Sequence, residues 1–236
     1  MKALIVAAGL GSRLGPLNDD APKPLVEVGG VPLIKRSIDI LESRGVDDVT
    51  VVVGHKQDSI RQVLGGAVSY VTNQDYATTN NIVSMSVGAP AVEGHSFLYL
   101  HADIWYRPEI VDIALEHPGE ICFAVERKPC GDEEMKVRVE NNLVVEADKG
   151  IAPADAFGEW LGIVKFEPAG AAAFLAQVHQ TMERSRTLYD CAVVKDLAAD
   201  GVMVHYADIG RVPWVEIDFP EDLEYARGLA RAEAEG

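Results

Sequence analysis

The stretch from residue 4 to residue 25 constrains this chain more than any other, because it joins an apolar strand to a glycine turn and two cations. Its first residues form an apolar run short enough for one buried strand, and Gly9 and Gly11 follow at once. A backbone approaches a phosphate closely only where side chains are absent and φ is free, and several N–H groups then point at one anion. Arg13 adds a planar fork of donors and Lys23 a compact charge, so the stretch predicts a triphosphate-binding site.

The spacing of these glycines excludes two common phosphate-binding motifs. A P-loop requires Gly-Lys-Ser/Thr after a wider spacing, and the Rossmann fingerprint requires a further glycine where this chain has Leu14. A Gly-x-Gly fragment alone is also found in structural turns, so the prediction depends on the longer pattern.

The longer pattern resembles the signature of the nucleotidyltransferases that make nucleoside-diphosphate sugars and alcohols. That signature is an apolar strand, Ala-Ala-Gly-x-Gly-x-Arg-Leu, and then Pro-Lys-Pro-Leu. Here it reads Ala7-Ala8-Gly9-Leu10-Gly11-Ser12-Arg13-Leu14 and Pro22-Lys23-Pro24-Leu25, and the resemblance extends to about residue 225. It implies a set of nucleotide-binding residues: Ala7, Ala8, Gly9, Gly11, Ser12, Arg13 and Lys23.

Charge and cysteine content exclude several other classes of protein. The net charge of −16 argues against a nucleic-acid partner, since phosphate backbones are bound by Lys and Arg. The three cysteines, Cys122, Cys130 and Cys191, have neither the number nor the spacing of a disulfide framework or a zinc site. The first apolar run is too short for a signal peptide or a membrane span, so we expect a cytoplasmic protein without a membrane partner.

Apolar periodicity predicts an α/β fold. Strands are expected at residues 4–8, 49–53, 68–71 and 97–103, with helices at 32–41, 58–64 and 82–88 between them. This alternation is typical of parallel strands covered by helices on both faces. We therefore expect a single nucleotidyltransferase domain over residues 1–236, a Rossmann-like three-layer sandwich around a mostly parallel mixed sheet.

The second half of the chain predicts an addition to that sheet. Two alternating runs at 136–146 flank Asn141-Asn142 and predict a small antiparallel hairpin with a primed turn, over the acceptor site. Further helices are expected at 108–117, 168–184, 188–200 and from Pro220 onward, and further strands at 121–125, 159–166, 203–207 and 214–220.

Acidic residues at two predicted strand ends suggest a metal site. Asp103 ends one strand, and the alternation of the last strand puts Glu216 and Asp218 on one face. Ligands of open α/β sheets bind beyond the carboxyl ends of strands, and Mg²⁺ prefers carboxylate and phosphate oxygens. Asp103 and Asp218 are the expected Mg²⁺ ligands, with Glu216 as a third. The family often has an acid where this chain has His101, and whether His101 replaces that ligand is left open.

The resemblance implies further contacts that residue chemistry alone leaves open. Asn73 and Asn80 lie in a polar segment, either as caps and turn residues or beside the nucleotide. On the acceptor side, Glu159 and Gly162 match an acid and a glycine that line the pocket in similar enzymes. The remaining acceptor candidates, whose aromatic members could equally be core residues, are Lys149, Trp160, Tyr189, Asp190 and Trp214.

The expected function is a Mg²⁺-dependent cytidylyltransferase of the phosphocholine or aminoethylphosphonate type. An acceptor oxygen attacks the α-phosphorus of a nucleoside triphosphate and pyrophosphate leaves, with Arg13, Lys23, Asp103 and Asp218 as the catalytic residues. CTP is favoured by resemblance only, and a homodimer is one possible assembly. The alternatives are a sugar-1-phosphate, inositol-phosphate or polyol-phosphate nucleotidyltransferase and, from another class, a non-catalytic nucleotide sensor.

Overall fold

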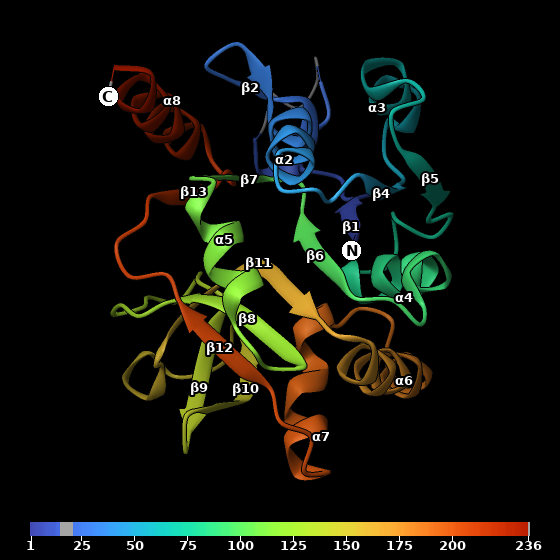
Figure 1. Ribbon diagram of the computed structural model, residues 1–236, viewed down its shortest axis with the longest axis vertical. Coiled ribbons are helices and arrows are strands. Elements are labelled where there is room, and N and C mark those ends of the chain that lie inside the picture. The colour runs from blue at the N-terminus through green and yellow to red at the C-terminus, as the bar shows by residue number, and fades with distance from the viewer. Residues whose placement is uncertain (15–20, 236) are drawn as a thin grey trace.

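The computed structural model describes residues 1–14 and 21–235. Of Ser12 it describes the backbone only. A nine-stranded sheet forms its centre (Figure 1), and the strands along its main path follow the order β10-β9-β11-β6-β1-β4-β5. The parallel half consists of β6 (Phe97–His101), β1 (Lys2–Ala7), β4 (Asp48–Val53) and β5 (Ser69–Thr72). The carboxyl ends of these strands therefore meet at one edge.

The other half of the sheet is mostly antiparallel. Strand β11 (Gly158–Phe166) pairs antiparallel with β6 on one side and with β8 (Ile121–Glu126) and β9 (Lys136–Glu140) on the other. Strand β12 (His205–Asp208) pairs parallel with β8. Because β6 lies between β1 and β11, its end marks the boundary between the two halves.

The predicted hairpin is present as β9 and β10 (Leu143–Asp148), paired antiparallel. Asn141 and Asn142 at its turn have φ values of 51° and 61°, which is the left-handed conformation that a type I′ turn requires at both central residues. Asparagine tolerates that conformation better than most residues. The hairpin extends the central sheet through β9, and Lys149 follows its second strand.

Helices cover both faces of the sheet, as the period-two pattern of β1 requires. Ile5 packs in one apolar cluster with residues of α2 (Leu33–Glu42), α3 (Gln57–Leu64) and α5 (Glu109–Glu116). Its neighbour Leu4 packs on the opposite face with α4 (Asn81–Val92), α6 (Pro168–Arg184) and α7 (Val194–Ala199). The expected α/β fold with a helix–sheet–helix sandwich is confirmed.

Two small strand pairs and the last helix hold the residues that follow the glycine turn. Strand β7 (Ile104–Tyr106) pairs with β13 (Trp214–Glu216), and β2 (Glu27–Val28) pairs with β3 (Val31–Pro32). Helix α8 (Pro220–Glu235) contacts both β13 and β2 (Figure 1). A third apolar cluster, with Leu14 and Ile217 among its members, fills the space between them.

Some element boundaries differ from the predicted ones. The helix expected at 188–200 is a short 3₁₀ turn (Asp190–Val193) followed by α7. The last strand ends at Glu216, so Asp218 lies in the turn before α8. Strand β7 was not predicted, because its three residues are fixed by pairing with a segment more than 100 residues away.

Candidate active site

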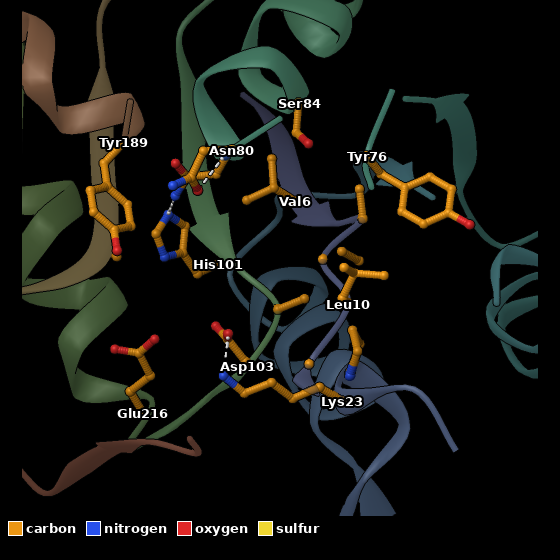
Figure 2. Close-up of a pocket in the computed structure, with 18 of the residues that line it drawn as sticks. Val6, Leu10, Lys23, Tyr76, Asn80, Ser84, His101, Asp103, Tyr189 and Glu216 are labelled. Atoms are coloured by element: carbon orange, nitrogen blue, oxygen red, sulfur yellow. Dashed lines mark hydrogen bonds and ion pairs between the residues drawn. The ribbon is translucent and has the colours of Figure 1, made fainter. Parts of the chain in front are cut away.

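A cavity of about 470 Å³ lies at the carboxyl ends of β1 and β6 (Figure 2). It brings together residues from the glycine turn, the boundary strand β6, the strand β11 and the last strand pair. The predicted site residues that line it are Ala7, Ala8, Gly9, Gly11, Arg13, Lys23, Asn73, Asn80, Asp103, Lys149, Trp160, Gly162, Tyr189, Glu216 and Asp218. Ser12 begins a 3₁₀ turn beside them, and its side chain is outside what the structure describes.

The glycine turn opens the cavity on the side of β1. Gly11 has a φ of 64°, and its carbonyl accepts a hydrogen bond from the Leu14 N–H at 3.2 Å. A Cβ added to Gly9 would meet no atom within 4 Å, so the backbone there is open to a ligand. Gly54 packs closely against the start of this turn, since a Cβ added to Gly54 would lie only 2.8 Å from the Ala8 carbonyl oxygen.

Lys23 is the central cation of the site. Its Nζ donates to Asp103 Oδ2 at 2.7 Å and to Asp218 Oδ1 at 2.6 Å, and only 8% of the residue is exposed. Arg13 Nη1 lies 2.7 Å from the second oxygen of Asp218. Three segments far apart in the sequence therefore converge on one charged group, as the sequence predicted from the ends of the strands.

The charges of this group shift the pKa values of its members. Burial lowers the pKa of Lys23, but the carboxylates of Asp103, Glu216 and Asp218 outweigh it and hold that pKa above its ordinary value. Burial raises the pKa of Asp103, but Lys23 and His101 hold it below its ordinary value. The pKa of Glu216 is raised to about 7, first by burial and then by the charge of Asp103. The cluster thus favours a charged Lys23.

The same carboxylates have the geometry and chemistry of a divalent-metal site. One oxygen each from Asp103, Glu216 and Asp218 lies within 4.8 Å of the other two. Asp103 Oδ1 is buried and has no hydrogen-bond partner within residues 1–14 and 21–235, so one hard oxygen is left available. Mg²⁺ is held by one or two carboxylates together with phosphate oxygens. These residues fit such an ion.

Asn73 and Asn80 lie on the side of the cavity formed by α4 and the segment before it. The Asn73 amide donates to Ser84 Oγ at 3.1 Å and accepts from the Asp75 N–H at 2.9 Å. Asn80 caps α4, since its Oδ1 accepts from the Asn81 N–H at 2.8 Å. Both side chains thus serve local structure at the cavity wall, and contact with a nucleotide stays a prediction.

Three expected acceptor residues are not among those that line the cavity. Glu159 is buried against Lys128 at 2.7 Å, and the Trp214 indole N–H donates to Glu126 at 2.9 Å. Asp190 is 1% exposed and lies behind His101. Each of these side chains contacts a partner on a neighbouring strand or loop. The local sequence pattern does not predict these contacts. Their direct contact with an acceptor stays a prediction.

His101 is a cavity residue whose role the sequence left open. Its Nε2 lies 3.0 Å from Asp190 Oδ2 and 3.3 Å from Asn81 Nδ2. Burial alone lowers the pKa of His101, but Asp190 raises it to about 9. Its position two residues before Asp103 was the available signal, because alternate residues of a strand face the same side. Asn81 and Ser84 also line the cavity and were not proposed from the sequence.

Within residues 1–14 and 21–235, no helix has the length and apolar character needed to cross a membrane. The predicted cytoplasmic location stays a prediction.

Comparison with known proteins places the chain among nucleotidyltransferases. It is 31% identical over 248 residues to a Streptomyces rubellomurinus protein named CMP-5'-(3-aminopropyl)phosphonate synthase, which covers 96% of this chain and 38% of that protein. It is 34% identical over 123 residues to a Lancefieldella rimae protein named 2-aminoethylphosphonate cytidylyltransferase, which covers 51% of this chain and 49% of that protein. The chain thus spans about half or less of the length of these two curated relatives.

A solved structure of the inositol-1-phosphate CTP transferase from T. maritima has the same fold, with a TM-score of 0.83 at 23% identity over 100% of this chain and 96% of that one. The family model of the MobA-like NTP transferase domain matches residues 3–132, which is more than half of the 236 residues. The chain therefore belongs to the MobA-like NTP transferase domain family.

Proposed function

We propose that this protein is a Mg²⁺-dependent cytidylyltransferase that moves CMP from CTP to a small amine-bearing phosphonate or phosphate and releases pyrophosphate. The observation that carries the proposal is the position of Lys23, which lies between Asp103 and Asp218 at 2.7 and 2.6 Å in a cavity that opens onto a glycine turn. This arrangement matches the needs of direct phosphoryl transfer, in which positioning and charge neutralisation do most of the work.

The glycine turn and the two cations are the groups that would hold the triphosphate. Gly9 and Gly11 line the cavity, where backbone N–H groups of the turn would face phosphate oxygens, and Arg13 adds a fork of donors at the cavity edge. Lys23 has a compact charge beside the carboxylates, where it offsets negative charge that grows at the reacting phosphorus. Attack by an acceptor oxygen forms one P–O bond to the α-phosphorus and breaks the bond to pyrophosphate.

The charge balance of the group around Lys23 supports the need for a divalent ion. The two cations Lys23 and Arg13 face three carboxylates. This charged group by itself therefore does not offer the positive charge that a triphosphate requires. Asp103, Glu216 and Asp218 would hold Mg²⁺, which when bound neutralises phosphate charge and keeps the reacting groups together. Without it, we expect weak nucleotide binding.

The relatives and the cavity wall support the proposed acceptor class. Both curated relatives carry names that refer to an aminoalkyl phosphonate, in which an ammonium and a phosphonate sit at opposite ends of a short chain. The wall near the hairpin offers a Tyr189 ring, and Lys149 Nζ lies 6.0 Å from its centroid. An aromatic face attracts an ammonium, and a lysine attracts a phosphonate. CTP as the nucleotide and an aminoalkyl phosphonate as the acceptor are thus parts of the proposal.

Pyrophosphate release tests this function directly. CTP, UTP, GTP and dTTP are each combined with 2-aminoethylphosphonate, 3-aminopropylphosphonate, phosphocholine, inositol 1-phosphate and glucose 1-phosphate, and mass spectrometry identifies the product. We expect turnover with CTP and the amine-bearing acceptors. Turnover with glucose 1-phosphate only would make the protein a sugar-phosphate nucleotidyltransferase, whereas nucleotide binding without turnover on any acceptor would make it a sensor.

A further inference from the structure

His101 occupies the point where the two halves of the cavity meet. It is the last residue of β6, which lies between the glycine-turn strand β1 and the acceptor-side strand β11. Asp103, two residues further on, belongs to the acidic cluster. In Figure 2 the ring of His101 lies between Tyr189 and Asp103. In the proposed reaction, the phosphorus and the acceptor oxygen would come together at this boundary.

One nitrogen of the His101 ring is fixed by a buried carboxylate. Asp190 is 1% exposed, and its Oδ2 accepts from Nε2 at 3.0 Å and from the Tyr99 hydroxyl. Its other oxygen accepts from the Cys191 N–H at 2.9 Å. A carboxylate accepts and does not donate, so the shorter contact to Asp190 puts a hydrogen on Nε2, and the Asn81 amide nitrogen 3.3 Å away does not donate to it. The carboxylate therefore sets the tautomer and orientation of the ring, as second partners of histidine do in many sites.

The strand beside the ring is shaped to admit it. Gly162 on β11 has a φ of 79°, and an added Cβ would lie 2.8 Å from both Cγ and Nδ1 of His101. The pairing of β11 with β8 shifts register between Trp160 and Val164, around this glycine. The Trp160 ring meets the imidazole edge at a centroid distance of 5.1 Å. The imidazole is thus held in place on two sides.

The other ring nitrogen, Nδ1, is turned toward the part of the cavity that contains Glu216 and Tyr189 in Figure 2. No hydrogen bond to Nδ1 is found within residues 1–14 and 21–235. The ring is thus anchored by a carboxylate and packed by a tryptophan, while Nδ1 has no partner from these residues. Nδ1 is therefore available to a ligand where the two halves of the cavity meet.

We propose that His101, positioned by Asp190, binds the phosphonate or phosphate group of the acceptor through Nδ1 and does not replace a metal ligand. This inference rests on the proposed function for the identity of the acceptor. The bond needs one proton between Nδ1 and a phosphonate oxygen. An acceptor monoanion brings that proton on oxygen and a protonated ring brings it on nitrogen, so the same contact forms in both cases. Asp190 is a positioning residue.

Two substitutions of similar shape distinguish the roles of the two ring nitrogens of His101. The amide nitrogen of asparagine falls near the position of Nδ1 and that of glutamine near Nε2, so His101→Asn keeps a donor toward the cavity and His101→Gln keeps the one toward Asp190. The probes are methylphosphonate and inorganic phosphate, titrated calorimetrically into the full chain loaded with Mg²⁺ and a non-hydrolysable CTP analogue. His95→Gln, at an exposed histidine, is the control.

We expect His101→Gln to weaken binding of both probes about 10- to 100-fold, the value of a hydrogen bond to a charged group, while His101→Asn loses less. Binding of the CTP analogue and its Mg²⁺ requirement should match those of wild type in both variants, which also shows that they fold. Equal affinities of all variants for the probes would overturn the proposal. A changed Mg²⁺ requirement with unchanged probe binding would overturn it in favour of a metal ligand.

A second readout uses the wild-type protein alone, so it does not depend on the folding of any variant. In long-range ¹H–¹⁵N NMR spectra we expect the His101 ring to be protonated at Nε2, and methylphosphonate to shift the Nδ1 resonance but not that of the His95 ring. A resonance that methylphosphonate leaves unmoved would contradict the inference. If the chain turns over none of the amine-bearing phosphonate or phosphate acceptors but shows these effects, the proposed function fails and the anion site at His101 remains.

Discussion

Lys23 and Asp218 lie 195 positions apart in the chain, yet Lys23 Nζ donates to Asp218 Oδ1 at 2.6 Å. The contact joins the segment that follows the glycine turn to the turn that opens the last helix. Because the same lysine also binds Asp103 at 2.7 Å, the charged centre depends on three separate segments. The proposed function depends on this convergence.

Replacing Lys23 should abolish most of the activity. Lys23→Met removes the buried cation that offsets charge at the reacting phosphorus, and we expect turnover to fall about 10²-fold or more. The measurement is steady-state pyrophosphate release with CTP and 2-aminoethylphosphonate. Lys35→Met, at an exposed lysine of α2, serves as the control and should keep wild-type rates. Near-normal turnover of Lys23→Met would remove Lys23 from the mechanism.

The acidic cluster should bind a divalent ion. Asp103→Asn and Asp218→Asn each remove one charge from a group whose oxygens lie within 4.8 Å of one another. We expect either change to weaken binding of Mn²⁺, used as a spectroscopic substitute for Mg²⁺, by about 10-fold or more, since even outer partners of metal sites are worth that much. Electron paramagnetic resonance titration measures it. Asp200→Asn, at an exposed carboxylate, should bind as wild type does; equal loss in all three would refute the site.

Gly162 should not tolerate a side chain. Gly162→Ala places a Cβ in a left-handed conformation and 2.8 Å from the His101 ring, so we expect a loss of about 1–3 kcal/mol in the free energy of unfolding. Gly228→Ala in helix α8 is the matched control, where the nearest atom would be 4.0 Å away, and it should stabilise by about 0.5–1 kcal/mol. Chemical denaturation measures both, and equal effects would show that the space beside His101 is not constrained.

Substitution of Trp214 tests whether this residue binds the acceptor or serves the fold. Its indole N–H donates to Glu126 at 2.9 Å, and the residue lies on β13, the strand that ends with Glu216. Trp214→Phe should therefore lower the free energy of unfolding by about 0.5–1.5 kcal/mol, the value of one hydrogen bond, because Glu126 keeps Lys128 as a partner at 3.2 Å. The acceptor KM should change no more than the KM for CTP. A selective rise in the acceptor KM would instead support the direct contact that the sequence suggested.

Much of the fold and the charged centre follows from local sequence. The strand periods, the glycine turn and the asparagine hairpin each depend on neighbouring residues, and all three are present. The meeting of Asp103 with Asp218 follows from a general rule, because strand ends in such sheets face one crevice. These predictions needed no knowledge of particular long-range contacts.

The rest depends on partners that no local pattern specifies. Asp190 was an acceptor candidate from the sequence, but it is buried, and its carboxylate accepts from three donors on β6 and its own turn. Glu159 is neutralised by Lys128 on a neighbouring segment, and burial still raises its pKa. Which buried carboxylate meets which donor is decided by packing of distant segments, so the sequence alone did not specify the partners of these acids.

Phosphorus NMR of the reaction mixture tests the central claim most directly. With CTP, Mg²⁺ and 2-aminoethylphosphonate, we predict that the free phosphonate signal is replaced by a pair of coupled signals from a new P–O–P linkage to CMP, in step with pyrophosphate, and that Lys23→Met forms neither. Pyrophosphate with no coupled pair, or an unchanged acceptor signal for every amine-bearing phosphonate and phosphate tested, would contradict the account.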